Sequence, residues 1–276
     1  MLSGIGPRKH LECKGIKVIA DLPVGENYHD HVGIPMIHTL GKSTGIAPET
    51  DRRLYSFPSI TAYVALNESS RYPDYIATVY YLLRENAAEQ ALLDTAFYYR
   101  YSDCILNRVL QKSKGYKLLY TYIKNTIPKS RGRVTLRSSD CKDNPIIDTG
   151  IYSNEADLED HINYLQDYFK LGDTKVFKDI GAEFIDPVDE ICGEYEFGNR
   201  EYWKCYALCM MTPSNHAVGT CAMGSVVDGE LNVIGVKRLR VVDASVIPVI
   251  TSGGTYAATM MIAEKAANII LQDMHR

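Results

Sequence analysis

The chain has 276 residues, a formal net charge of −4 and a hydrophobic content of 46%. This composition is typical of a globular protein, and the mild negative charge argues against a nucleic-acid partner. No apolar run approaches the roughly 18 residues that cross a bilayer, and no charged-then-apolar leader precedes Gly4. The sequence therefore predicts neither a membrane span nor a signal peptide within it.

The first thirty or so residues predict a short helix at Pro7–Leu11 and a strand at Ile16–Ile19. The pair Gly4-Ile-Gly6 lacks both a preceding strand and a third glycine, so it does not meet the context of a dinucleotide-binding fingerprint. On an extended chain His29 and His31 would project to one side, as two metal ligands do. No third ligand is spaced nearby, so we expect a hydrogen-bonded loop and no metal site.

A series of short strands follows, rich in β-branched and aromatic residues and bounded by glycine, proline or polar clusters. The expected strands are Gly33–Leu40, Ile60–Leu66, Tyr75–Leu83, Tyr116–Ile123 and Val134–Leu136, and the polar residues 41–53 predict a loop. Strands that follow one another without helices favour an antiparallel sheet. The 20 tyrosines would suit an organic substrate on that sheet, and ordinary sheet packing is their commoner role.

Two helices are expected after the strands. Ser153–Leu158 offers a polar cap and acidic residues in the first turn, and apolar residues recur at helical spacing as far as Phe169. The second helix spans Arg200–Met211. On it Cys205 and Cys209 share a face, although a helical backbone does not favour a disulfide between them.

The 7 cysteines leave at least one unpaired. Their spacing shows neither a C-x-x-C pair nor a zinc pattern, and we expect small buried thiols.

The tail concentrates the chemistry in three stretches. They are Pro213-Ser-Asn-His216-Ala-Val-Gly-Thr-Cys-Ala-Met-Gly224, Leu239-Arg-Val-Val-Asp243-Ala-Ser-Val-Ile-Pro248, and Ser252-Gly-Gly-Thr-Tyr256 before an apolar helix that ends near Leu271. A glycine-rich helix start exposes unpaired N–H groups and the positive end of the helix dipole, so it suits an electron-rich ligand atom. A well-capped helix without a ligand is the alternative. The residues of this helix expected in the core are Met261, Ile262, Ala266, Ile269 and Ile270.

These motifs resemble the carboxy-terminal signature of the glucose–methanol–choline (GMC) family of FAD-dependent alcohol oxidoreductases. Two earlier stretches agree: Leu2-Ser-Gly-Ile-Gly-Pro7 with Asp21-Leu-Pro-Val-Gly-Glu-Asn-Tyr-His-Asp-His31, and Pro128-Lys-Ser-Arg-Gly-Arg-Val-Thr-Leu-Arg137. Family members begin with a strand, glycine loop and helix that hold the ADP part of FAD, which this sequence does not contain. We therefore interpret the chain as a carboxy-terminal half.

The resemblance implies an α+β fold in three segments. Residues 1–32 would be a remnant of the FAD-binding domain, and residues 33–190 would form a substrate-binding domain of antiparallel sheet with packing helices. Residues 191–276 would return to the incomplete FAD-binding domain as a strand, Leu239–Val242, and the last helix.

The resemblance also implies a catalytic pair. His216 occupies the position of the general base, a role that suits a pKa near neutrality. The family's second residue, histidine or asparagine, falls at Gly254, which has no side-chain donor. Losing such a donor costs on the order of 10²–10³ in rate, unless Tyr256, Asn215 or a water molecule replaces it.

The implied cofactor is FAD, and four residues are expected to bind it. Asp243 and Ala244 would meet its ribityl and pyrophosphate part. The backbone of Thr255 and Tyr256 would lie by the flavin pyrimidine oxygens, where the helix dipole favours anionic reduced flavin.

The predicted function is FAD-dependent oxidation of a small-molecule alcohol, with a missing amino-terminal half needed for FAD and with no nucleic-acid or membrane partner. Two alternatives remain open. Gly254 and the missing Rossmann half favour a catalytically inactive or partial pseudoenzyme, and the tyrosine-rich sheet suits a module that binds a small apolar ligand.

Overall fold

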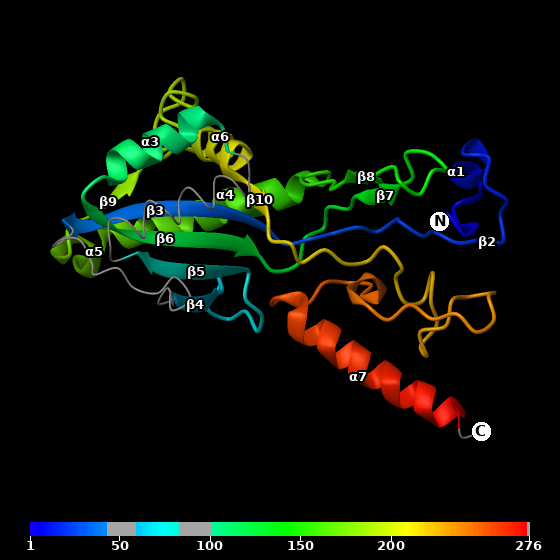
Figure 1. Ribbon diagram of the computed structural model, residues 1–276. Coiled ribbons are helices and arrows are strands. Elements are labelled where there is room, and N and C mark those ends of the chain that lie inside the picture. Colours follow the sequence, from blue (N-terminus) through cyan, green and yellow to red (C-terminus); the bar gives the residue numbers. More distant parts are fainter. Residues whose placement is uncertain (43–58, 83–100, 275–276) are drawn as a thin grey trace, which may run out of the picture. The chain divides into compact units, whose positions relative to one another are not determined.

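The computed structural model describes residues 1–42, 59–82 and 101–274, which form two compact units (Figure 1). The first unit comprises Met1–Val32, Thr126–Asp157 and Pro213–Arg276, and the second comprises Gly33–Asn125 and Leu158–Thr212. Residues 126–157 thus belong to the first unit, whereas the division of the sequence at 33–190 groups them with the sheet. The expected loop at 41–53 lies almost wholly outside the described residues. The functional assignment of segments 1–32, 33–190 and 191–276 stays a prediction.

A six-stranded sheet organises the second unit, with strand order β10-β3-β6-β5-β4 and β9 paired to β3. Its strands are β3 (Val32–Lys42), β4 (Ser59–Val64), β5 (Tyr75–Leu82), β6 (Tyr116–Asn125), β9 (Ala182–Ile185) and β10 (Thr212–Pro213). The pairs β3–β6, β3–β9, β4–β5 and β5–β6 are antiparallel. The antiparallel sheet expected from the sequence is confirmed.

Helices cover both faces of this sheet. They are α3 (Asp103–Ser113), α4 (Glu155–Phe169), the short α5 (Lys175–Asp179) after a 3₁₀ turn at Lys170–Asp173, and α6 (Arg200–Met210). On one face, Ile37 and Leu118 pack with Val109 of α3. Thr121 lies three residues beyond Leu118 and so points to the opposite face, where its hydroxyl is 2.5 Å from that of Tyr168 on α4. A sheet covered on both sides explains why β3 reads as an almost continuous apolar run.

Helix α6 is anchored by buried aromatic residues and by a disulfide. Tyr202, Trp203 and Tyr206 are at most 2% exposed, and the Tyr206 hydroxyl donates to the Pro35 carbonyl at 2.8 Å. The expectation of buried thiols is wrong in two respects. Cys192 and Cys205 form a disulfide, and the exposed thiols are Cys13, Cys104 and Cys141.

The first unit contains short elements. They are β1 (Ile5–Gly6) paired in parallel with β2 (Ala20–Asp21), α1 (Arg8–Cys13), β7 (Arg133–Thr135) paired with β8 (Ile146–Asp148), a 3₁₀ turn at Ala244–Val246, and α7 (Thr255–Met274). The strand expected at Ile16–Ile19 is wrong, because the residues that pair with β1 are those of β2, which begins at Ala20. The strand expected at Leu239–Val242 is reduced to an isolated bridge between Arg240 and Asn232.

Helix α7 packs along a single stripe. Ala266 is buried in a cluster with Val226 and Val246, whereas Met261 and Ile270 are 65% and 38% exposed, so their expected place in the core is wrong. The large apolar residues exposed along α7 are Tyr256, Met260, Met261, Ile270, Leu271 and Met274. Even so, of the helices in the part of the chain that the structure describes, none has both the length and the apolar character to span a bilayer.

Candidate active site

His216 lies in the loop that follows β10, next to Asn215, whose φ of 59° turns the chain. Two contacts fix it, and both partners come from the chain just before β3. Its backbone N–H donates to Asp30 Oδ1 at 2.8 Å. Its ring nitrogen Nδ1 lies 2.9 Å from Nδ1 of His31, with the two rings nearly perpendicular at 88°.

The other ring nitrogen of His216, Nε2, faces Gly254 at the start of α7. A Cβ atom added to Gly254 would lie 3.4 Å from Nε2 and 3.6 Å from Cε1 of His216. The two positions that the sequence names as a catalytic pair are therefore brought together in the first unit. Because Gly254 has no side chain, nothing from this residue fills the space in front of Nε2.

His31 and Asp30 support His216 from a buried position. His31 is 2% exposed, and its Nε2 lies 3.0 Å from the Thr126 carbonyl oxygen. Burial raises the pKa of Asp30 to about 6, although the His216 N–H pulls it in the opposite direction. The second carboxylate oxygen of Asp30, Oδ2, is buried and has no hydrogen-bond partner.

His29 has a different role from its neighbour His31. Its Nδ1 lies 2.7 Å from the Asn27 carbonyl and its Nε2 accepts from the Ile250 N–H at 3.1 Å. Both ring nitrogens are thus used by the backbone, which requires a neutral ring, and burial lowers the pKa of His29 accordingly. His29 joins two loops of the unit and has no free ring nitrogen for a ligand.

Ligand-type atoms of Asp30, His31 and His216 lie within 4.8 Å of one another. The sequence did not group these residues, because 185 positions separate His31 from His216. The signal in the sequence was the His-Asp-His run at residues 29–31. Only the fold shows that His31 is the histidine of this run that contacts His216.

The residues expected to contact the cofactor form a second group in the same unit. Asp243 Oδ1 accepts from the Ser245 N–H at 2.8 Å and so caps the 3₁₀ turn. Ala244 packs against the same apolar cluster, formed by Val218, Ile247 and Ile250, as Ala258 of α7. This cluster links the Asp243–Ala244 corner to the helix that begins at Thr255.

Thr255 and Tyr256 are the first two residues of α7. Thr255 is buried at 7% exposure, whereas the Tyr256 side chain is 80% exposed. The first N–H groups of a helix have no intrahelical partner, and these two residues are the ones that the sequence expects to contact the flavin ring.

The early glycines do not fit the phosphate end of FAD. A Cβ on Gly4 would lie 2.4 Å from the Lys17 carbonyl oxygen, so this glycine serves close chain packing. Gly6 belongs to the small parallel pair β1–β2. Neither stands in the strand, glycine loop and helix arrangement that binds a pyrophosphate.

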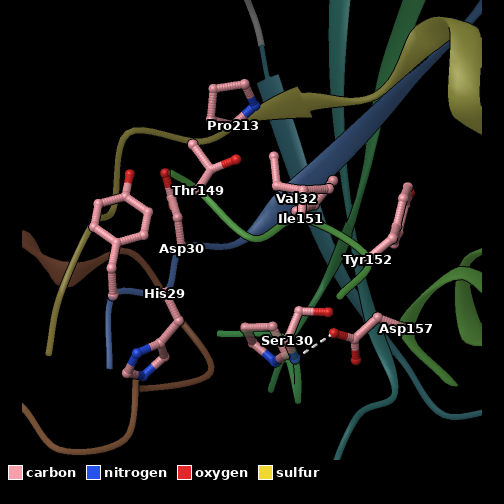
Figure 2. A pocket seen from close by; sticks show the side chains of 11 residues that line it. His29, Asp30, Val32, Ser130, Thr149, Ile151, Tyr152, Asp157 and Pro213 are labelled. Atoms are coloured by element: carbon pink, nitrogen blue, oxygen red, sulfur yellow. Dashed lines mark hydrogen bonds between the residues drawn. The ribbon is translucent and has the colours of Figure 1, made fainter. Parts of the chain in front are cut away.

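A small hollow lies beside this site (Figure 2), lined among others by Asp30, Thr149, Tyr152 and Pro213. Its volume of about 10 Å³ leaves room for roughly one water molecule. The dashed bond in Figure 2 is the 2.7 Å contact from the Ser130 N–H to Asp157. The hollow is too small for an alcohol substrate.

Comparisons with known proteins identify the family of the chain. Residues 128–263 match the family model described as GMC oxidoreductase. The ecdysone oxidase of Bombyx mori is 33% identical over 98% of this chain and 42% of its own length. The alcohol dehydrogenase (acceptor) of Pseudomonas putida is 29% identical over 99% of this chain and 48% of its own length.

Among solved structures, pyridoxine 4-oxidase from Mesorbium loti superposes with a TM-score of 0.74 at 22% identity. The match covers 100% of this chain and 48% of the oxidase, and it supports the fold. The chain spans about half the length of the curated relatives it matches, between 42% and 48% for the two named above. The chain belongs to the GMC oxidoreductase family, with residues 128–263 matching its carboxy-terminal domain model.

Proposed function

We propose that this chain supplies the catalytic face of a FAD-dependent alcohol oxidoreductase in which His216 is the general base. The observation that carries the proposal is the position of His216 Nε2, which faces Gly254 at the start of α7. FAD, when bound, supplies the acceptor for the hydride that leaves the carbinol carbon. Relatives named as an ecdysone oxidase and an alcohol dehydrogenase support oxidation of a hydroxyl group.

The chain's own task in this reaction is to remove the hydroxyl proton. A neutral imidazole with a bare Nε2 accepts that proton as the C–H bond breaks, which is efficient when the base has a pKa near the working pH. The Asp30 contact to the backbone of His216 holds the base in position. Accurate placement of this kind contributes to the rate because it removes the cost of orienting the base.

Four residues are proposed to bind the cofactor. The N–H groups of Thr255 and Tyr256 belong to the first turn of α7, where no intrahelical partner exists for them. Asp243 and Ala244 form the adjacent corner through the shared apolar cluster. These positions suit the flavin and ribityl end of FAD, and the phosphate loop would come from a sequence that this chain does not contain.

A catalytically inactive pseudoenzyme is the second candidate, and Gly254 favours it. The family places a histidine or asparagine donor there, which would stabilise the developing alkoxide. A chain without that donor can keep the fold and the flavin contacts while oxidising alcohols slowly or not at all.

The test is a fusion that places the amino-terminal half of the Bombyx mori ecdysone oxidase before Met1. The fusion would be purified, checked for stoichiometric flavin absorbance, and mixed anaerobically with ecdysone, aryl and aliphatic primary alcohols. Bleaching of the flavin by one of these alcohols supports the proposal. If dithionite bleaches the bound flavin and none of the alcohols does, the proposal is contradicted and the pseudoenzyme is favoured.

A further inference from the structure

We infer that His31 is a positioning residue that determines which ring nitrogen of His216 carries the proton. The inference rests on the proposed role of His216 as the base. It goes further, because it assigns a task to the buried histidine whose sequence context suggested only a loop contact. Three contacts within the first unit support this assignment.

The first step fixes the proton on His31. Its Nε2 lies 3.0 Å from the Thr126 carbonyl oxygen, and a carbonyl oxygen can only accept a hydrogen bond. Nε2 of His31 must therefore carry the hydrogen. His31 is 2% exposed, and burial disfavours the charged imidazolium. In the neutral ring that remains, Nδ1 of His31 bears a lone pair.

The second step passes this preference to His216. Its Nδ1 lies 2.9 Å from Nδ1 of His31, a normal distance for a hydrogen bond between two nitrogen atoms. Two unprotonated nitrogens at that distance would repel each other through their lone pairs, so one of them must carry a hydrogen and donate it. Because His31 Nδ1 is the acceptor, Nδ1 of His216 carries the hydrogen.

The third step connects the tautomer with the reaction. A neutral imidazole has one hydrogen, so Nε2 of His216 is bare. This is the nitrogen that faces Gly254, where the substrate hydroxyl is proposed to lie. The opposite tautomer would present an N–H there and could not take a proton. When Nε2 gains the hydroxyl proton, the Nδ1–H bond to His31 is kept and helps to hold the charged ring.

Asp30, His31 and His216 could alternatively share a metal ion, since their ligand atoms lie within 4.8 Å of one another. A metal on the two Nδ1 atoms requires lone pairs on both and excludes the proton between them. The two arrangements therefore differ in a measurable way at His216 Nδ1.

The primary test is long-range ¹H–¹⁵N NMR of the imidazoles in the full chain labelled with ¹⁵N-histidine, without flavin. Bare and protonated ring nitrogens have widely separated ¹⁵N shifts, and a His216→Gln sample assigns the signals. We expect Nδ1 of His216 to be protonated and Nε2 to be bare. A wild-type His216 protonated at Nε2 would overturn the inference, as would stoichiometric Zn²⁺ binding that shifts both His31 and His216.

Variants separate the hydrogen bond from general packing. In His31→Phe the acceptor is lost, and the ratio of the two His216 tautomers should shift toward Nε2–H by about tenfold, the equivalent of one buried hydrogen bond. His31→Asn places an oxygen close to the position of Nδ1 and should restore most of the original ratio. His29→Phe removes an equally buried imidazole and should leave the ratio unchanged. An equal tautomer shift in His29→Phe would overturn the inference.

Kinetics in the fusion protein provide the second arm. His31→Phe should lower kcat about tenfold with KM nearly unchanged, and His31→Asn should recover most of the loss. An unchanged kcat in His31→Phe overturns the positioning role. A wild-type fusion that fails to oxidise any alcohol removes the proposed function instead, while the NMR result on the unfused chain stands independently.

Discussion

At the scale of single residues, the proposed site is distinguished by the missing side chain of Gly254. Its φ angle lies outside the left-handed region, and its Cβ position is in ordinary contact with the His216 ring at 3.4 Å. The backbone therefore accepts other residues at this position, and the absence of a side chain is a chemical feature of the site rather than a requirement of the turn.

Gly254→Asn should therefore return a hydrogen-bond donor to the developing alkoxide. In the fusion protein we expect faster flavin reduction, because the donor should stabilise the transition state by up to about 3 kcal/mol. Gly229→Asn is the matched control, because the Cβ position of Gly229 lies in open space. Stopped-flow reduction that is slower in Gly254→Asn than in the control would show that the amide blocks His216.

Asp30 should make stability depend on pH. Because burial raises its pKa from 3.8 to about 6 in the folded protein, the folded state binds the proton more tightly than the unfolded chain does. The associated stability is fully present below about pH 4 and is lost as pH rises through about 6. The shift corresponds to roughly 3 kcal/mol.

Asp30→Asn removes this titration and keeps an acceptor for the His216 N–H. Relative to wild type, its free energy of unfolding should therefore rise between pH 4 and pH 7.5, by up to roughly 3 kcal/mol. Urea denaturation at the two pH values measures the difference. Parallel pH dependences of the two proteins would contradict the raised pKa.

At the scale of elements, the sequence predicts what its local patterns determine. Strands β3, β4, β5 and β6 and helices α4 and α6 agree with their predicted ranges to within a few residues, because hydrophobic period and capping residues are local signals. Strand β2 depends on its pairing with β1, and the bridge at Arg240 depends on its pairing with Asn232. Their extent could therefore not be predicted from local patterns.

The disulfide and the buried face of α7 are also products of tertiary structure. Cys192 and Cys205 lie 13 residues apart, and this spacing does not by itself indicate a disulfide. Only the packing of the preceding loop on α6 brings the two cysteines together. Helix α7 is apolar around most of its circumference, so its sequence did not show that Ala266 would be buried while Met261 is exposed.

The buried stripe of α7 can be tested with a pair of neighbouring alanines. Ala266 is 1% exposed and packs in the cluster with Val226. Ala266→Leu should overfill this cluster and destabilise the protein by about 1–3 kcal/mol. Ala267 is exposed, and Ala267→Leu is the control with an expected effect within about 0.5 kcal/mol. Equal thermal shifts in the two variants would contradict the packing described for α7.

At the scale of the whole molecule, the chain matches its relatives over nearly all of its length and spans about half of theirs. The sequence predicted the family, because its motifs occur in the family's order along the chain. The catalytic roles of His216 and Gly254 stay predictions. The partnership of His216 with His31 could not be predicted, because it depends on two loops that meet across 185 positions.

The chain by itself should bind FAD weakly or not at all, because its described residues lack a glycine-rich phosphate loop and such a loop holds most of the pyrophosphate contacts. The exposed apolar residues of α7, including Met261 and Met274, should in addition bind a hydrophobic dye. Gel filtration with FAD followed by absorbance, and dye fluorescence on the same sample, measure both. A stoichiometrically yellow protein would contradict the first expectation, and an absence of dye binding the second.

The most direct test of the account is the rate of flavin reduction by an alcohol in the fusion protein carrying His216→Ala, measured anaerobically by stopped flow. Because the lost imidazole is the proposed proton acceptor, we predict a rate lower by roughly 10²–10⁴, with flavin affinity nearly unchanged. His161→Ala is the control, a buried histidine of the second unit, and should reduce flavin at close to the wild-type rate. A His216→Ala protein that binds flavin and is reduced at the wild-type rate would contradict the assignment of His216 as the base.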